Sequence, residues 1–188
     1  MDSEWGISMP AERRDRKKNR LEDYDYSQDG YYFVTICTKN MVERFGEIRD
    51  DKMILSPIGE IVDQCWQAIP EHFPNVELDE YVVMPNHVHG VIVIENNNDV
   101  GVQNFEPLHD KINKFQHIIP RSLGSIIRGF KIGVTKYCRN NNCGNVVWQR
   151  NFYDHIIRNE RSLTRIREYI HNNPSQWASD RNNPDNID

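Results

Sequence analysis

The sequence predicts an α+β fold of the ferredoxin-like type, with an antiparallel sheet of four to five strands and two helices on one face. Runs of β-branched and aromatic residues predict strands at 31–38, 78–84, 87–94 and 146–148. Apolar residues spaced three and four apart predict helices at 57–69, 122–139 and 159–172. The order strand, helix, strand, strand, helix, strand is the ferredoxin-like order, so the face without these two helices is expected to hold a site.

Local signals support these boundaries. Pro57 suits the first turn of a helix, and Pro85 interrupts the apolar run between two of the strands. Asn159 is a predicted N-cap, and the last helix is expected to end before Pro174 because the residue preceding a proline avoids the helical region. The second helix is expected to bury one stripe, formed by Leu123, Ile127, Phe130, Val134 and Tyr137.

Charge is unevenly distributed, which allows a nucleic-acid partner despite a net charge of −5. We divide the chain into a basic N-terminal arm at 1–30, a domain at 31–177 and a polar C-terminal tail at 178–188. The arm and the second helix carry candidate contacts to phosphates, Arg13, Arg14, Arg16, Arg128, Lys131, Lys136 and Arg139, and a solvated tail is the alternative for the arm.

The sequence indicates a cytoplasmic protein. No apolar run reaches the roughly 18 residues of a membrane-spanning helix, and the first 20 residues lack the apolar stretch of a signal peptide. The cysteines are scattered and form no CxxC pair, which favours reduced thiols over a zinc site or disulfides.

Two histidines begin the third predicted strand. His87 and His89 are two residues apart, so their side chains point to the same face while Val88 points to the other. Two imidazoles on one face can bind one divalent cation. Two ordinary half-buried histidines would give the same pattern, and the spacing alone does not distinguish the two interpretations.

The terminal helix carries a tyrosine beside its apolar stripe. Tyr169 and Asn173 are four residues apart and therefore lie on one face. A phenol has a pKa of about 10, so it needs help to act as a nucleophile at neutral pH, and a nearby cation can provide it. The alternative is structural, with Tyr169 packed at the edge of the stripe and Asn173 ending the helix.

Several stretches resemble one family when they are taken together. They are YVVMPNHVHGVIVI, then GFK, then VVWQRNFYDHIIRNE, then REYIHNNPSQW. In this order they strongly resemble the REP-associated tyrosine transposases of the single-tyrosine HUH transposase superfamily. The stretch DYDYSQDGYYFVTICT resembles the start of many such sequences, and the resemblance extends from about Tyr24 to Trp177.

The resemblance implies roles for individual residues. His87 and His89 match the histidines of the HUH motif, Tyr169 matches the nucleophile, and Asn173 matches a polar residue that can complete the metal site. Tyr153 is a rival nucleophile that we interpret as a packing residue. The pair at 154–155, an aspartate and a histidine, matches a recurrent feature to which we assign no role.

The resemblance also implies a reaction and its partners. The expected substrate is single-stranded DNA beside a palindromic hairpin, cleaved through a 5′-phosphotyrosine intermediate with Mg²⁺ or Mn²⁺. Imidazole pairs also suit zinc or nickel, so the metal identity comes from the family. A monomer or a homodimer is possible, and the short segment at 158–162 favours attack within one chain.

Two other functions compete with this interpretation. A non-catalytic single-stranded nucleic-acid-binding module can use the same sheet, although the aromatic motif of RNA recognition domains is missing. A metal-dependent hydrolase of small molecules is the other alternative, and the basic arm and basic helix argue against it.

Overall fold

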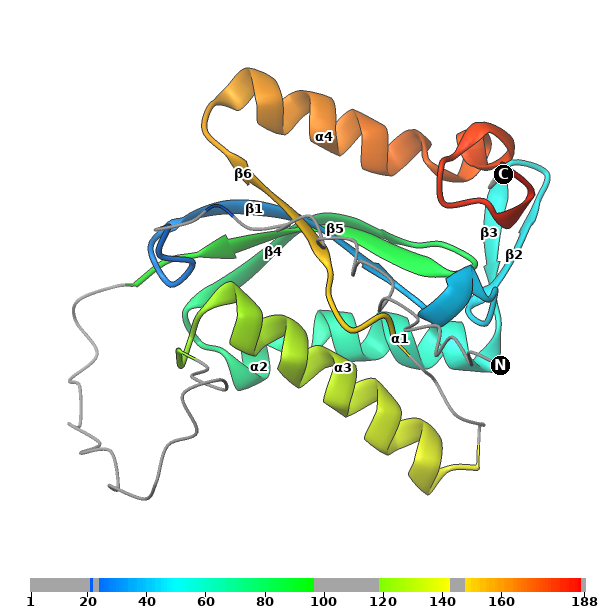
Figure 1. Ribbon diagram of the computed structural model, residues 1–188, viewed down its shortest axis with the longest axis horizontal. Helices are drawn as coiled ribbons and strands as arrows, with labels where there is room; N and C mark the ends of the chain where they lie inside the picture. Colours follow the sequence, from blue (N-terminus) through cyan, green and yellow to red (C-terminus); the bar gives the residue numbers. More distant parts are fainter. Residues whose placement is uncertain (1–20, 22–23, 97–118, 143–147, 187–188) are drawn as a thin grey trace, which may run out of the picture.

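The computed structural model describes residue 21 and residues 24–96, 119–142 and 148–186 (Figure 1). Four antiparallel strands form the central sheet in the order β4-β5-β1-β6. Their bounds are Gly30–Cys37 for β1, Val76–Val83 for β4, His87–Ile94 for β5 and Tyr153–Ile157 for β6. The predicted ferredoxin-like α+β fold is confirmed.

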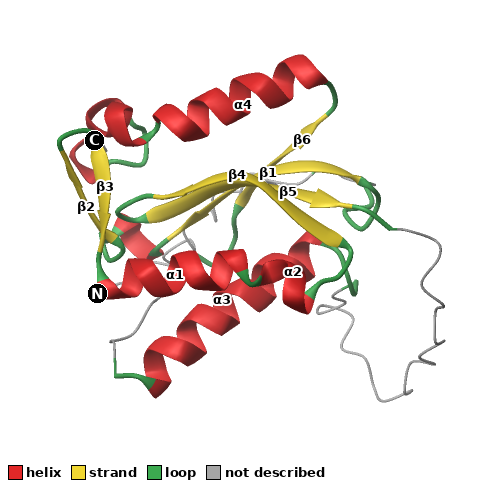
Figure 2. Ribbon diagram, turned by 180° about the vertical axis from the view of Figure 1, so that it is seen from behind, coloured by secondary structure: helices red, strands yellow, loops and turns green. Residues whose placement is uncertain are grey.

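Helices cover both faces of this sheet (Figures 1 and 2). On one face lie α1, α2 and α3, with bounds Pro57–Gln67, Ile69–His72 and Leu123–Asn140. The helix α4 (Glu160–Asn172) crosses the other face, followed by the short 3-10 helices η2 (Pro174–Ser179) and η3 (Pro184–Asn186). None of the described helices is both long and apolar enough to cross a membrane.

Each face of the sheet has its own apolar core. The larger core lies under α1 and α3 and includes Tyr32, Trp66 and Phe130. The smaller one lies under α4 and contains Phe33, Val91, Ile157, Leu163 and Ile170. Because α4 contributes Leu163 and Ile170 to the second core, burial of apolar area holds this helix on the sheet.

The last strand of the sheet lies later in the chain than predicted. We expected it at 146–148, where Trp148 forms an isolated bridge with Thr38 and residues 146–147 lie outside the described part. The strand that pairs with β1 at this edge is β6, from Tyr153 to Ile157. The run at 146–148 shares the composition of a strand, but pairing with β1 depends on contacts distant in sequence, which composition does not encode.

Three other features differ from the expectations. A hairpin of β2 (Gly46–Arg49) and β3 (Lys52–Leu55), preceded by η1 (Lys39–Met41), was not predicted. Tyr137 is 45% exposed while Cys138 is buried, because the buried stripe follows the 3.6-residue period to Cys138. The end of the predicted arm is packed, with the rings of Tyr24 and Tyr26 4.9 Å apart beside Tyr32.

Candidate active site

The two histidines lie on β5, in the interior of the sheet. His87 and His89 pair with Cys37 and Thr35 of β1, and both side chains are fully buried. They occupy the face that α4 covers, where the ring of His89 lies 5.2 Å from that of Tyr169, while Val88 between them packs into the core under α1 and α3. The alternation of a strand therefore places both imidazoles on the face predicted for the site.

A hydrogen-bond network orients His87. Its Nδ1 lies 2.7 Å from Oδ1 of Asn86, whose Nδ2 donates to the carbonyls of Met41 at 3.0 Å and Asn182 at 2.8 Å. These two bonds fix the amide, so its oxygen faces the ring and accepts a hydrogen bond from the N–H at Nδ1. The Nε2 of His87 is left with its lone pair, and it is buried without a protein partner in the described part.

His89 is held in a similar way from the neighbouring strand. Its Nδ1 lies 2.9 Å from Oγ1 of Thr35. Burial lowers the pKa of His87 to about 4 and the pKa of His89 well below its ordinary value, and the neighbouring imidazole adds to the shift at His89. Both rings are therefore neutral near pH 7, which is the form of histidine that binds cations.

The tyrosine of α4 reaches these histidines within one chain. The Oη of Tyr169 lies 3.1 Å from Nε2 of His89, and its ring meets Phe33 edge-on at 6.1 Å. The N-cap Asn159 begins the helix by accepting a hydrogen bond from the Ser162 amide at 2.9 Å. The structure thus brings together the predicted nucleophile and the predicted pair of histidines.

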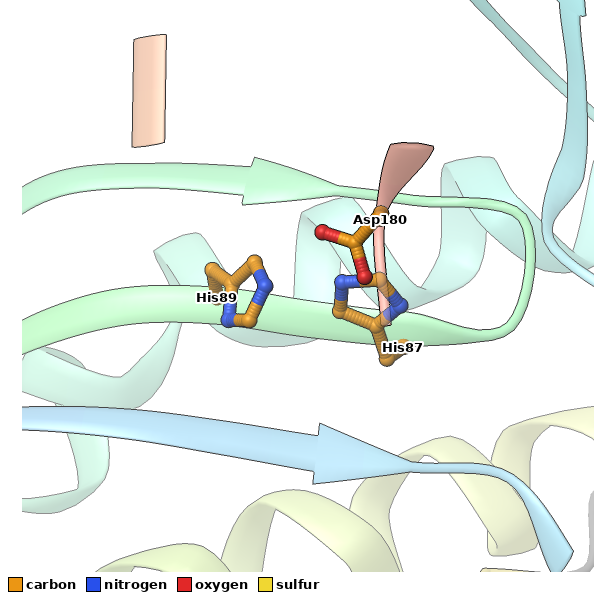
Figure 3. Close-up of side chains that lie close together, drawn as sticks. All are labelled: His87, His89 and Asp180. Carbon is orange, nitrogen blue, oxygen red and sulfur yellow. The ribbon is translucent and has the colours of Figure 1, made fainter. Parts of the chain in front are cut away.

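An aspartate that the sequence analysis missed completes the cluster. Asp180 follows η2. One of its carboxylate oxygens and one ring nitrogen from each of His87 and His89 all lie within 4.8 Å of one another (Figure 3). Its Oδ2 accepts hydrogen bonds from Asn173 at 2.9 Å and Tyr169 at 3.3 Å. Its Oδ1 accepts one from the Asn182 amide at 2.6 Å.

Part of the segment expected to be a polar tail is therefore built into the site. Asp180, Asn182 and Asn183 are all buried. Polar residues in a short C-terminal segment usually lie exposed, and only the turn of η2 brings these back toward β5. No local pattern in the sequence signals that position.

Asn173, the predicted third metal ligand, lies beside the cluster. It is buried, and its Nδ2 is occupied by the hydrogen bond to Asp180. Its Oδ1 has no hydrogen-bond partner among the residues the structure describes. A cation between His87, His89 and Asp180 would supply a partner for this oxygen and for the His87 nitrogen, so the donor set fits a divalent metal.

The phenol of Tyr169 is protonated in this environment. Burial and the nearby charge of Asp180 raise its pKa to about 12, although Arg181 opposes the shift. The hydroxyl therefore donates its hydrogen bond to Asp180, and it needs a positive charge beside it to become a nucleophile.

On β6, the aspartate and histidine of the pair at 154–155 differ in their exposure to solvent. Asp154 is buried and His155 is exposed, because adjacent residues of a strand point to opposite faces. Tyr153 lies on the same face as Thr35, with which it pairs, and is 43% exposed. The predicted rival nucleophile is thus beside the site but outside the cluster of His87, His89 and Asp180.

The predicted phosphate contacts do not lie at this cluster. Arg128, Lys136 and Arg139 are exposed on α3, which covers the opposite face of the sheet (Figure 1). Lys131 donates to the carbonyls of Gln149 at 2.9 Å and Asn151 at 3.2 Å, so it also holds the segment before β6. The arm residues Arg13, Arg14 and Arg16 lie outside the described part, and all seven contacts stay predictions.

Comparison with known proteins gives the family. No family model matches the chain. An uncharacterized protein of Haemophilus influenzae is 46% identical over 167 residues, which cover 88% of this chain and 91% of the relative. A second protein of the same organism, described as "Putative REP-associated tyrosine transposase", is 25% identical over 150 residues, which cover 80% of this chain and 73% of the relative.

A solved structure shares the fold. A REP-associated tyrosine transposase bound to a REP hairpin superposes with a TM-score of 0.56 and 20% identity, covering 84% of this chain and 73% of its own. The chain therefore shares a family with the uncharacterized protein, and it resembles the REP-associated tyrosine transposases in sequence and in fold.

Proposed function

We propose that this transposase-like protein cuts and rejoins single-stranded DNA through a covalent bond to Tyr169. One observation carries the proposal: the Tyr169 hydroxyl lies 3.1 Å from His89, in a cluster that also contains His87 and Asp180. The structural relative bound to a REP hairpin supports DNA with a hairpin as the substrate.

The reaction follows from the groups around the phenol. The proton of Tyr169 passes to Asp180, whose Oδ2 already accepts its hydrogen bond. The phenolate oxygen attacks phosphorus, a bond forms between them, and the bond from phosphorus to the 3′ oxygen breaks. The 3′ oxygen takes the proton from Asp180 and leaves as a hydroxyl, which restores the carboxylate, and the 5′ phosphate stays on the tyrosine. A second 3′ hydroxyl can reverse the step and join strands.

A divalent cation, Mg²⁺ or Mn²⁺, fits the cluster. His87, His89 and Asp180 would hold it, with the free Oδ1 of Asn173 as a further ligand. When bound, it supplies positive charge that favours the phenolate and polarises the phosphate. The protein itself orients the two imidazoles, because Asn86 and Thr35 form hydrogen bonds with the Nδ1 atoms of His87 and His89.

The substrate proposal extends to the basic residues. The DNA would lie along the face of α4 and reach α3 around the β6 edge of the sheet, where Arg128, Lys136 and Arg139 contact phosphates. Binding through several phosphates predicts a steep loss of affinity as the salt concentration rises.

The test is a covalent adduct on a denaturing gel. Single-stranded hairpin DNA is incubated with the protein and Mg²⁺ or Mn²⁺, and a protein band shifted by attached DNA is expected. A binding module would give no shift, and a hydrolase would cut DNA without attachment. The Tyr169→Phe variant keeps the packing on Phe33 and should bind DNA while losing the adduct, whereas Tyr153→Phe should retain it.

A further inference from the structure

A pocket opens directly beside the cluster of His87, His89 and Asp180. Its volume is about 280 Å³, and its lining includes Thr35, Cys37, Asn151, Tyr153, Arg181 and Asn182. Thr35 forms the hydrogen bond to His89, and Asn182 accepts the one from Asn86, so the pocket and the catalytic cluster share a wall. The volume is close to the lower limit of about 300 Å³ for small-ligand sites.

One side of the pocket is an exposed aromatic ring. Tyr153 is 43% exposed, although its strand β6 lies against β1 in the sheet. The guanidinium of Arg181 lies over this ring, 5.5 Å from its centroid, and the Phe33 ring lies 6.4 Å away at a steep angle to it. Aromatic rings and guanidinium groups are the surfaces on which nucleic-acid bases stack, so Tyr153 and Arg181 together can receive a base.

One of the residues that line the pocket, Asn182, has a hydrogen-bond donor without an acceptor. Asn182 is 7% exposed, and its Nδ2 is buried with no partner in the described part of the chain. Its backbone is fixed, because its amide donates to Asp180 and its carbonyl accepts from Asn86. A buried donor left unpaired costs free energy, so this amide is suited to a ligand that brings an acceptor.

The segment that contributes Gln149 and Asn151 to the lining is held by hydrogen bonds within the protein. The Gln149 amide donates to the Cys37 carbonyl at 2.9 Å, and Lys131 binds the carbonyls of Gln149 and Asn151 from the side of α3. These bonds fix the segment at 149–151 before any ligand binds. A wall that is ordered in advance reduces the entropy that binding must overcome.

We propose that this pocket binds one nucleobase of the single-stranded segment next to the phosphate that Tyr169 attacks. The base stacks on Tyr153, and a carbonyl or ring nitrogen of the base accepts a hydrogen bond from Nδ2 of Asn182. The pocket would position the strand and contribute to sequence preference. The proposal rests on the proposed function, because the site beside the pocket defines which nucleotide is held.

The test measures whether the contribution of one base to the binding affinity depends on Tyr153. A DNA hairpin with oligothymidine tails is compared with a series in which one tail thymidine at a time is replaced by an abasic site. Fluorescence anisotropy in EDTA gives the affinities without cleavage. One position should weaken binding to the unmodified protein by about five- to hundredfold when the base is absent.

The variants then assign that position to the pocket. With Tyr153→Ala, removal of the same base should have no further effect, whereas Tyr153→Phe should behave like the unmodified protein. Tyr137→Ala is the matched control, since Tyr137 is 45% exposed on the opposite layer. Asn182→Ala should reduce the effect of the base about two- to tenfold.

The outcomes separate the two proposals. If Tyr153→Ala retains the full sensitivity to the missing base, or no tail position is sensitive, the pocket does not bind a base, even where the Tyr169 adduct forms. If the sensitivity depends on Tyr153 but the unmodified protein forms no adduct with Mg²⁺ or Mn²⁺, the proposal that the pocket binds a base is supported. The strand-transfer proposal then fails.

Discussion

At the scale of single residues, each candidate metal ligand is oriented by a hydrogen bond with a neighbouring polar side chain. Asn86 fixes the His87 ring, and Asn173 fixes the Asp180 carboxylate, so the electron pairs of the cluster converge before a cation arrives. Such supporting partners typically change metal affinity by about 10- to 100-fold when they are removed. The cation site is therefore expected to depend on Asp180 as much as on the histidines.

We expect Asp180→Asn to weaken Mn²⁺ binding at least about tenfold, because it removes the negative charge of the cluster while keeping the side-chain shape. Isothermal titration calorimetry with Mn²⁺ measures this directly. Asp185→Asn, at an exposed position five residues later, is the control and should bind like the unmodified protein. Unchanged affinity in Asp180→Asn, with a loss in Asn173→Ala, would instead assign the third ligand to Asn173.

At the scale of elements, the position of α4 decides where the phenol lies. Leu163 and Ile170 are buried against the sheet, and Arg167 binds Asp79 of β4 through its Nε at 2.8 Å and a second nitrogen at 2.5 Å. Arg167 is two residues from Tyr169, so this bidentate pair fixes the helix close to the nucleophile.

We expect Arg167→Gln to lower stability by about 1 kcal/mol at pH 7, since the side chains of Arg167 and Asp79 are 41% and 16% exposed and solvent weakens the pair. The hydrogen bond from Arg167 lowers the pKa of Asp79, so its stabilisation is present above the ordinary carboxyl pKa and is lost as the pH falls through the lowered value. The difference between variant and unmodified protein should shrink at acidic pH.

Thermal or urea unfolding at a series of pH values measures this difference. Arg165→Gln removes the same charge from an exposed position of α4 and serves as the control. An equal loss in both variants, or a loss that persists at low pH, would show that the ion pair with Asp79 does not hold the helix.

At the scale of the whole molecule, the fold class and the common face of the two histidines were predictable. Hydrophobic periods gave most helices and strands, and alternation on β5 placed His87 and His89 on one face. The position of Tyr169 followed from the family resemblance, and the structure places it within one chain.

The remainder depends on contacts that are distant in the sequence. Asp180 enters the site only because η2 turns the chain back, and the edge strand at Tyr153 is selected by pairing with β1. The pocket beside the site joins Thr35, Tyr153 and Asn182, which no sequence period connects. Residues on three separate segments meet only in the folded chain, so local patterns do not predict them.

The most direct test of the central claim is to map the covalent bond between protein and DNA. The adduct is digested with protease and nuclease, and mass spectrometry identifies the peptide that carries a nucleotide through its 5′ phosphate. We expect the nucleotide on Tyr169, in the peptide that contains YIHNNP. A nucleotide on Tyr153, or cleaved DNA with no modified peptide, would contradict the assignment of Tyr169 as the nucleophile.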